Sequence, residues 1–155
     1  MLMNNAVLAL VVAMASPTHA AKIPVIVPGW PKLDFPFSTA VVSFGGIVHI
    51  SGMQGFNFSA PKPARVTGGI TPETKMTMSN IQTVMKAARN ATMDDILECT
   101  VVLSDLKNFD AMNKVYATFF GKVPPSRIAY QATLFGGAAV EIKCMGDVSQ
   151  YYGRK

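Results

Sequence analysis

Two stretches of the chain place apolar residues at helical spacing. In the first, four apolar residues at i, i+3, i+4 and i+7 share one face: Ile81, Val84, Met85 and Ala88. Upstream, Thr71-Pro72-Glu73 is typical of a helix start, because it supplies an N-cap hydroxyl, a proline at the first helical position and an acidic first turn. We therefore predict a helix from Thr71 to Asn90, with Asn90 as a left-handed C-terminal cap.

The second stretch begins near Asn108, whose side chain can cap a helix N-terminus. Its apolar residues follow at spacings of three, four and three: Phe109, Met112, Tyr116 and Phe119. Gly121 and the Pro124-Pro125 pair are expected to end this helix, because neither residue type favours a helix interior.

Short apolar runs rich in β-branched residues predict five strands, at residues 38–43, 47–51, 97–103, 126–133 and 139–145. The Gly45-Gly46 pair separates the first two runs and favours a hairpin turn. Residues 23–37 contain four prolines and are expected to be extended. Residues 55–69 contain further prolines and glycines, which predicts a long loop.

The order β-β-α-β-α-β-β predicts an α+β fold. We expect a two-layer sandwich, in which a five- to six-stranded mixed sheet carries two helices on one face. No repeat or linker divides residues 21–155, so they are expected to form a single domain. The other face of the sheet is also rich in apolar residues. Because no second helical layer is available, we expect another subunit to cover that face.

Composition excludes some classes of protein. Half of the 155 residues are hydrophobic and 15% are charged, which excludes a disordered chain. The net charge of +5 is mild and suits a small anionic ligand. Nucleic acid is an unlikely partner, because the lysines and arginines are scattered and form no basic stripe interleaved with aromatic residues.

Residues 1–20 resemble a secretory signal peptide. Residues 2–20 carry no charged side chain, the apolar run from Ala6 to Ala15 is too short to span a bilayer, and Thr18-His19-Ala20 resembles a cleavage site. Cleavage there implies a secreted protein with no membrane contact in its mature form. The alternatives are a disordered or strand-like extension and a mitochondrial presequence, which imply a cytoplasmic or mitochondrial protein. Glycosylation sequons at Asn57 and Asn90 fit the secretory route.

Metal, cofactor and covalent chemistry find no support in the motifs. His49 is the single histidine after residue 20, and it is expected to be structural. No metal-ligand spacing, phosphate-binding loop or Ser-His-Asp set occurs, so we expect neither a metal nor a cofactor. Cys99 and Cys144 lie in strand-like runs. We expect two buried free thiols, with one disulfide as the alternative.

One arginine and one glutamate stand out in strand contexts. Arg127 begins an apolar strand after Pro124-Pro125, and Glu141 lies between two β-branched residues. Charged residues in such positions are rarely buried without partners. One interpretation is a structural ion pair between Arg127 and Glu141, or ion pairs at the surface. The other is functional: Arg127 grips a carboxylate through two hydrogen bonds, and Glu141 handles a water molecule.

These residues belong to a series of motifs that resembles the Rid family (RidA/YjgF) of enamine/imine deaminases, over about residues 30–147. Five stretches carry the resemblance: Ile50-Ser51-Gly52, residues 80–88, residues 101–109, residues 125–131 and Val140-Glu141-Ile142. Each motif is weak alone, but five in the family's order are specific.

The resemblance implies a chorismate-mutase-like fold and a homotrimer around a central sheet-lined barrel, with active sites in clefts between subunits. It implies cofactor-independent hydrolysis of 2-iminopropanoate and 2-iminobutanoate to 2-oxo acids and ammonia. Arg127 would bind the substrate carboxylate, and Glu141 would orient or deprotonate the attacking water. Five further residues would line the substrate site: Phe37, Ser51, Gly52, Asn113 and Ala129.

The chain departs from the family pattern at positions near this site. Phe37 keeps an aromatic wall but lacks a phenol hydroxyl, and Met53 replaces the glutamine of the family's S-G-Q element. Ala129 excludes thiol chemistry at its position. These departures leave a second hypothesis open, a non-catalytic Rid-like trimer that binds small carboxylates or a protein partner.

Overall fold

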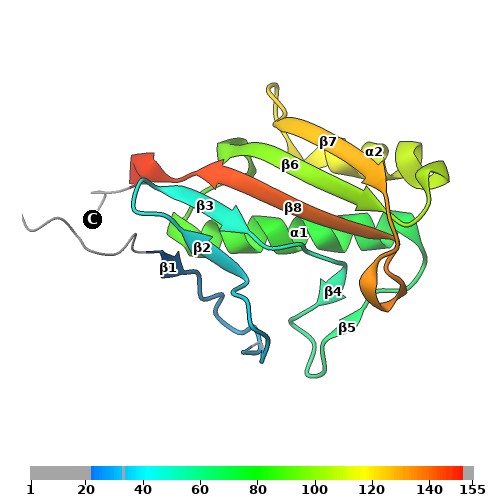
Figure 1. The fold of residues 1–155 in the computed structure, drawn as a ribbon, viewed down its shortest axis with the longest axis horizontal. Coiled ribbons are helices and arrows are strands. Elements are labelled where there is room, and N and C mark those ends of the chain that lie inside the picture. Colours follow the sequence, from blue (N-terminus) through cyan, green and yellow to red (C-terminus); the bar gives the residue numbers. More distant parts are fainter. Residues whose placement is uncertain (1–21, 33, 152–155) are drawn as a thin grey trace, which may run out of the picture.

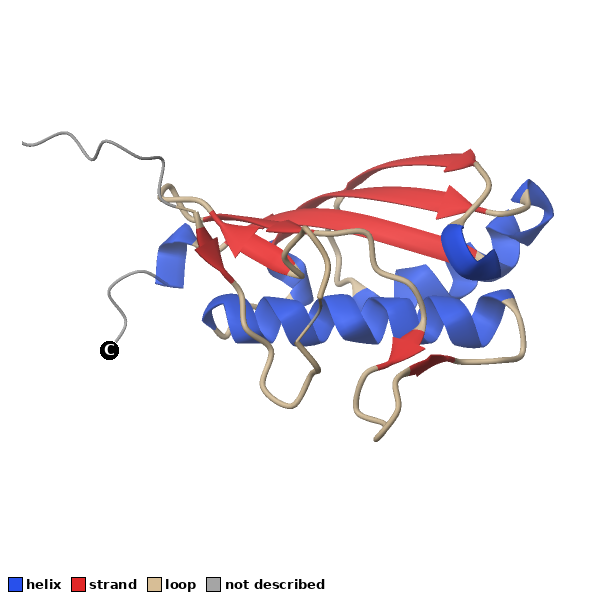
Figure 2. Cartoon of the chain, turned by 60° about the horizontal axis from the view of Figure 1, so that its bottom comes forward, coloured by secondary structure: helices blue, strands red, loops and turns tan. Residues whose placement is uncertain are grey.

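The computed structural model describes residues 22–32 and 34–151, so the expected leader at residues 1–20 lies outside the described residues. Six strands form one sheet in the order β1 (Ile23–Pro24), β2 (Ala40–Val42), β3 (Ile47–Ile50), β8 (Val140–Asp147), β6 (Ile96–Leu103) and β7 (Ser126–Gln131). The β6–β7 pair is parallel and the other pairs are antiparallel. Helices α1 (Ile70–Arg89) and α2 (Phe109–Tyr116) lie on one face of this sheet (Figures 1 and 2). The predicted two-layer α+β sandwich with a mixed sheet is confirmed.

Helix α1 covers the middle of the sheet with its predicted apolar stripe. Three members of the stripe are fully buried: Ile81, Val84 and Met85. The N-cap is Gly69 and the first helical residue is Ile70, so the prediction that Thr71 caps the helix was wrong. Gly69 has a φ of 82°, a conformation that glycine adopts readily, and it turns the chain into the helix before Thr71 is reached. Asn90 has a φ of 59°, which confirms the left-handed cap.

The chain enters α2 earlier than its sequence predicts. The Asp105 side chain accepts a hydrogen bond of 2.9 Å from the Lys107 backbone N–H, and a 3₁₀ turn then leads into the helix. Asn108 occupies the N-cap position but makes no side-chain cap, because the chain is already helical there. Met112 and Tyr116, two members of the predicted stripe, are buried. The stripe therefore faces the sheet as expected.

The segment expected to be a long loop contains a small hairpin, formed by β4 (Phe56–Asn57) and β5 (Ala64–Arg65). The hairpin projects away from the main sheet (Figure 1). The buried Asn80 of α1 ties its first strand to the helix: its side-chain amide donates to the backbone oxygens of Gln54 at 3.2 Å and Phe56 at 2.8 Å. The expectation of loop structure alone was therefore wrong here.

Cys99 and Cys144 form a disulfide, so the expectation of two free thiols was wrong. The two residues are directly opposite each other on the antiparallel strands β6 and β8, and their Cα atoms lie 4.1 Å apart. Facing positions on neighbouring strands bring the two sulfur atoms within bonding reach, although 45 positions separate the residues in the chain. Both side chains are buried on the helix-covered face, within the hydrophobic core.

The face of the sheet away from the helices carries large apolar side chains in the single chain. Leu97, Ile128 and Tyr130 each expose about half of their surface. Apolar patches of this kind commonly mark a contact with another protein surface. Within the described residues, no helix is both long enough and apolar enough to cross a membrane.

Candidate active site

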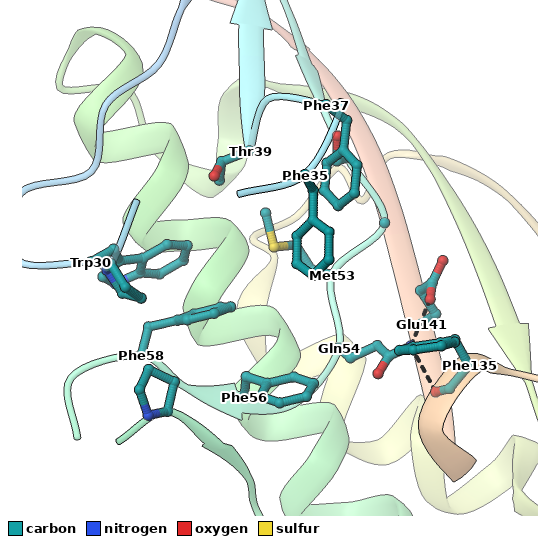
Figure 3. A pocket seen from close by; sticks show the side chains of 14 residues that line it. Trp30, Phe35, Phe37, Thr39, Met53, Gln54, Phe56, Phe58, Phe135 and Glu141 are labelled. Atoms are coloured by element: carbon teal, nitrogen blue, oxygen red, sulfur yellow. Dashed lines mark hydrogen bonds between the residues drawn. The ribbon is translucent and has the colours of Figure 1, made fainter. Parts of the chain in front are cut away.

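Glu141 lies on β8, on the face of the sheet away from the helices. Burial alternates along β8, with Val140 and Ile142 buried toward the helices, so Glu141 between them points to the opposite face. The Gln54 side chain approaches it from the segment after β3, and Nε2 of Gln54 donates to Oε2 of Glu141 at 2.8 Å. The same amide donates to the backbone oxygen of Phe135 at 3.3 Å (Figure 3). The bond to Phe135 fixes the position of the Gln54 amide, and the amide in turn orients the Glu141 carboxylate.

Gly52 lies against the other oxygen of the same carboxylate. A Cβ atom at Gly52 would overlap Oε1 of Glu141 and lie 2.9 Å from its Cδ. The lack of a side chain therefore lets the backbone of this segment approach the carboxylate. Neighbouring Ser51 donates its hydroxyl to the backbone oxygen of Ser38 at 2.8 Å, which joins the segment to the residues before β2.

Glu141 opens onto a cavity of about 760 Å³ that is lined mainly by aromatic side chains. Six aromatic residues line it: Trp30, Phe35, Phe37, Phe56, Phe58 and Phe135. Figure 3 shows Trp30 and Phe58 on one side of the pocket, with Phe35 and Phe37 across from them. Of the predicted substrate-binding residues, Phe37, Ser51 and Gly52 line this cavity together with Glu141.

Arg127 lies on the edge strand β7 and points to the helix-covered face. It is paired with the buried Cys99 of β6, and directly opposed residues share a face. Its Nη1 donates to Oδ1 of Asn113 at 2.7 Å. The guanidinium also lies over two rings of α2, 4.9 Å from the ring centre of Tyr116 and 5.6 Å from that of Phe109. These three residues occupy positions i, i+4 and i+7 of one helix face, so α2 orients the arginine.

The ring of Tyr116 packs against the guanidinium of Arg127. Burial of the phenol raises the pKa of Tyr116 to about 12, and the nearby positive charge of Arg127 opposes part of this shift. The phenol therefore stays neutral at physiological pH. Its buried hydroxyl has no hydrogen-bond partner among the described residues.

Ala129 is two residues beyond Arg127 on the same free edge of the sheet. The backbone N–H of Ala132 donates to the oxygen of Leu103 on β6. Because the direction of the backbone groups alternates along a strand, the N–H of Ala129 points away from β6, to the open edge. Arg127 and Ala129 thus offer a guanidinium and a backbone donor near each other, an arrangement that suits a carboxylate.

Arg127 and Glu141 do not lie together within one chain. Arg127 is on the helix-covered face of β7, whereas Glu141 is on the opposite face of β8, and β6 separates the two strands. The alternative of a structural ion pair between them is therefore wrong. Arg127, Asn113 and Ala129 form one group of predicted site residues, and Glu141, Phe37, Ser51 and Gly52 form another.

The structure adds residues that the motifs did not identify. Gln54 is the main addition, because its side chain donates a hydrogen bond to Glu141. The family pattern has its glutamine one position earlier, where this chain has Met53. An amide two residues after Gly52 was a usable signal for it. The rings of Trp30, Phe56 and Phe58 carried no such signal, because their Pro- and Gly-rich surroundings indicated only extended chain and loop.

Metal-ligating residues do not gather in the part of the chain that the structure describes. No group of three or more His, Cys, Asp or Glu side chains is placed to hold an ion within residues 22–32 and 34–151. His49 lies exposed on β3, opposite Met145 of β8, and does not line the cavity at Glu141.

Comparisons with known proteins identify the family. A family model described as Endoribonuclease L-PSP matches residues 31–148. The 2-iminobutanoate/2-iminopropanoate deaminase of Mus musculus is 34% identical over 111 residues, which cover 71% of this chain and 79% of the mouse protein. A RutC family protein of Drosophila melanogaster is 37% identical, covering 71% of this chain and 78% of the fly protein. The structure of the Rid-family protein YyfA from Yersinia pestis matches with a TM-score of 0.75 and 29% identity, over 83% of this chain and 100% of that chain. With the family model spanning most of its length, the chain belongs to the endoribonuclease L-PSP family, the YjgF/Rid family.

Proposed function

We propose that this protein hydrolyses reactive 2-imino acids to 2-oxo acids and ammonia, without a cofactor, at sites shared between the subunits of a homotrimer. The proposal rests on the surroundings of the Glu141 carboxylate. Its carboxylate opens onto a cavity, a neutral amide orients it, and no cation pairs with it among the described residues. A carboxylate held in this way can accept a proton from water.

Binding of the substrate carboxylate is assigned to the other group of site residues. The guanidinium of Arg127 and the edge N–H of Ala129 supply donors for it. Since Arg127 and Glu141 occupy opposite faces of one chain, we infer that a site with both takes them from two different subunits. The exposed apolar residues Leu97, Ile128 and Tyr130 support association through the open sheet face.

The chemistry needs one proton acceptor and a fixed substrate. Glu141 takes a proton from a water molecule while the water oxygen bonds to the iminium carbon, and the electron pair of the C=N bond moves to nitrogen. Glu141 then gives this proton to the nitrogen. As the C–N bond breaks, the hydroxyl proton passes to Glu141, the carbonyl forms and ammonia leaves. Glu141 then releases this proton to solvent, which restores the carboxylate. A protonated imine is already electrophilic, so positioning and one carboxylate suffice.

The direct test measures ammonia release from freshly generated 2-iminobutanoate. We expect hydrolysis by the wild-type protein and a large loss of kcat in Glu141→Gln, which keeps the shape of the side chain and removes the base. Wild-type protein that accelerates no 2-imino acid would contradict the proposal. If 2-oxo acids still bind through Arg127 in that case, the non-catalytic carboxylate-binding alternative holds. RNA cleavage, tested in parallel, addresses the activity in the family's description.

Subunit mixing tests whether the site is shared. Arg127→Ala and Glu141→Gln are each expected to be inactive alone. If each site takes its arginine from one subunit and its glutamate from the next around a ring, random mixing restores both groups in about a quarter of the sites. Co-refolded mixtures should then recover roughly that share of wild-type activity. No recovery, or a monomer by light scattering, would contradict the shared site.

We also propose that residues 1–20 direct the protein into the secretory pathway. The Cys99–Cys144 disulfide supports this, because such bonds form and persist mainly in oxidising compartments. N-terminal sequencing of the protein from its native cells should begin near Ala21. A native protein that retains Met1 and reduced cysteines would favour the cytoplasmic alternative.

A further inference from the structure

The cavity at Glu141 has its charged group at one end, where Phe135 lies beside Glu141 and Gln54, and the rest of its lining is mainly aromatic, with Thr39 among the rings (Figure 3). Glu141 and Gln54 meet at the polar end, beside Ser51. Away from them, the Trp30 and Phe58 rings pack at a tilt of 33° with their centres 4.3 Å apart, and Phe56 continues this wall, its ring centre 6.0 Å from that of Phe58. A ligand that fills the cavity therefore needs a polar head and a large apolar body.

A second aromatic wall stands at the mouth of the cavity. The rings of Phe35 and Phe37 stack in parallel with their centres 5.4 Å apart, and more than half of each side chain is exposed. Figure 3 places this pair across the pocket from Trp30. Two facing walls of rings suit a flat aromatic group, which can stack on either wall and exclude water from both.

The size of the cavity argues against small substrates. Its volume of about 760 Å³ falls within the roughly 300–1,000 Å³ typical of pockets for drug-sized ligands. An imino acid of three or four carbons would leave most of the aromatic surface in water. Only a substrate with a large apolar side chain gains from that surface.

We propose that the aromatic cavity binds the side chain of 2-imino acids with large, and above all aromatic, side chains, and that these are the preferred substrates. This specificity rests on the proposed hydrolysis at Glu141. The substrate carboxylate is bound through Arg127 of a neighbouring subunit, the imine carbon lies at Glu141, and the ring lies between the Trp30–Phe58 and Phe35–Phe37 walls.

Trp30 allows binding to be measured without any turnover, because it is the single tryptophan of the chain. The probes are 3-phenylpropanoate and propanoate, which share a carboxylate and differ in the ring. One added methylene in an apolar pocket contributes about tenfold or more, so a whole ring predicts at least roughly hundredfold tighter binding of 3-phenylpropanoate. We expect saturable change of Trp30 fluorescence with this probe at concentrations where propanoate has no effect.

Turnover gives the second readout. Imines generated in place from phenylalanine and from alanine by an amino-acid oxidase are compared by kcat/KM, and we expect the phenylalanine-derived imine to be preferred at least tenfold. Phe58→Leu should reduce this preference. Phe35→Ala, at an exposed position, tests the opposite wall with little risk to folding. Phe44→Leu, an equivalent change at an exposed residue outside the cavity lining, is the control and should leave the preference unchanged.

The outcomes separate the two proposals. If no imine is hydrolysed but Trp30 responds selectively to 3-phenylpropanoate, the hydrolysis is wrong and the cavity assignment stands. If imines are hydrolysed with a preference for the alanine-derived substrate, the cavity assignment is wrong and the hydrolysis stands. Trp30 fluorescence that responds to neither probe also overturns the assignment, and is expected if a neighbouring copy of the chain fills the cavity.

Discussion

The Gln54 side chain donates a hydrogen bond of 2.8 Å to the carboxylate of Glu141, across 87 positions of the sequence. The bond links the segment after β3 to the beginning of β8, on the face of the sheet away from the helices. It orients one carboxylate oxygen, while the bare backbone of Gly52 lies against the other. The position of the proposed base is thus set from two sides by one short segment.

Removing the Gln54 amide should weaken catalysis and leave folding intact. Because a single hydrogen bond contributes about 0.5–1.5 kcal/mol, Gln54→Ala is expected to lower kcat by up to roughly tenfold with little change in KM. Gln54→Glu replaces this donor with a second carboxylate, whose like charge repels Glu141, and it should lower kcat at least as much as Gln54→Ala. Gln82→Ala, on the exposed side of α1, is the control. A wild-type kcat in both Gln54 variants would show that Gln54 has no effect on the base.

Gly52→Ala should displace the Glu141 carboxylate without unfolding the protein. The new methyl group overlaps the end of a flexible side chain, which can rotate away. A displacement of about 1 Å at a reacting group can cost roughly hundredfold, so we expect kcat to fall by ten- to hundredfold. Urea denaturation should give a free energy of unfolding within about 0.5 kcal/mol of wild type. Gly45→Ala, where a Cβ has room, is the matched control. Full activity in Gly52→Ala would argue against the described position of Glu141.

Arg127→Ala should abolish binding of the substrate carboxylate. Loss of a bidentate pair to a charged ligand is expected to lower kcat/KM by roughly hundredfold or more. Arg127→Lys should rescue poorly, because an ammonium can neither form the planar fork nor stack in the same way on the Tyr116 ring. Steady-state kinetics with one imine checks both variants. Near-wild-type hydrolysis by Arg127→Ala would remove Arg127 from the site.

Tyr116→Phe should stabilise the fold modestly. The buried hydroxyl has no partner among the described residues, and an unsatisfied buried polar group costs about 1–3 kcal/mol, so we expect a gain of about 1 kcal/mol near pH 8.

The advantage of Tyr116→Phe should grow at alkaline pH. The pKa of Tyr116 is about 12 in the folded chain, above the ordinary value of 10. Between pH 10 and pH 12 the phenol therefore loses its proton more readily in the unfolded chain, so the free energy of unfolding of the wild type falls as pH rises through this range. The phenylalanine variant has no such proton to lose. Urea unfolding of both proteins at pH 8 and pH 11 measures the difference. A constant difference between the two pH values would contradict the raised pKa.

Reducing the Cys99–Cys144 disulfide should destabilise the domain. A bond that closes a loop of about 45 residues restricts the unfolded chain by about 4 kcal/mol in the chain-entropy account. We therefore expect a clear drop in Tm when the protein is unfolded under reducing conditions. The double variant Cys99→Ala/Cys144→Ala, which should show no response to reductant, is the control. Mass spectrometry that finds two alkylatable thiols in the native protein would contradict the bond.

Local sequence determined the elements and the chemical groups of this protein. The apolar stripe from Ile81 to Ala88 spans about two helical turns, and its spacing is enough to predict a helix. The β-branched runs around Val101 and Ile142 each lie within one strand, and their composition is enough to predict strands. Arg127 and Glu141 stand out for a similar reason, since a charge inside an apolar strand is visible without any knowledge of the fold.

Tertiary structure decided how those groups meet. Whether Cys99 and Cys144 bond depends on the register of β6 against β8, which no local pattern fixes. The placement of Arg127 and Glu141 on opposite faces follows from the same pairing. The aromatic cavity unites Trp30 with Phe58, whose segments are far apart in the chain and carry no periodic signal. Contacts of this kind depend on the packing of the whole domain, because burial, rather than local conformation, selects them.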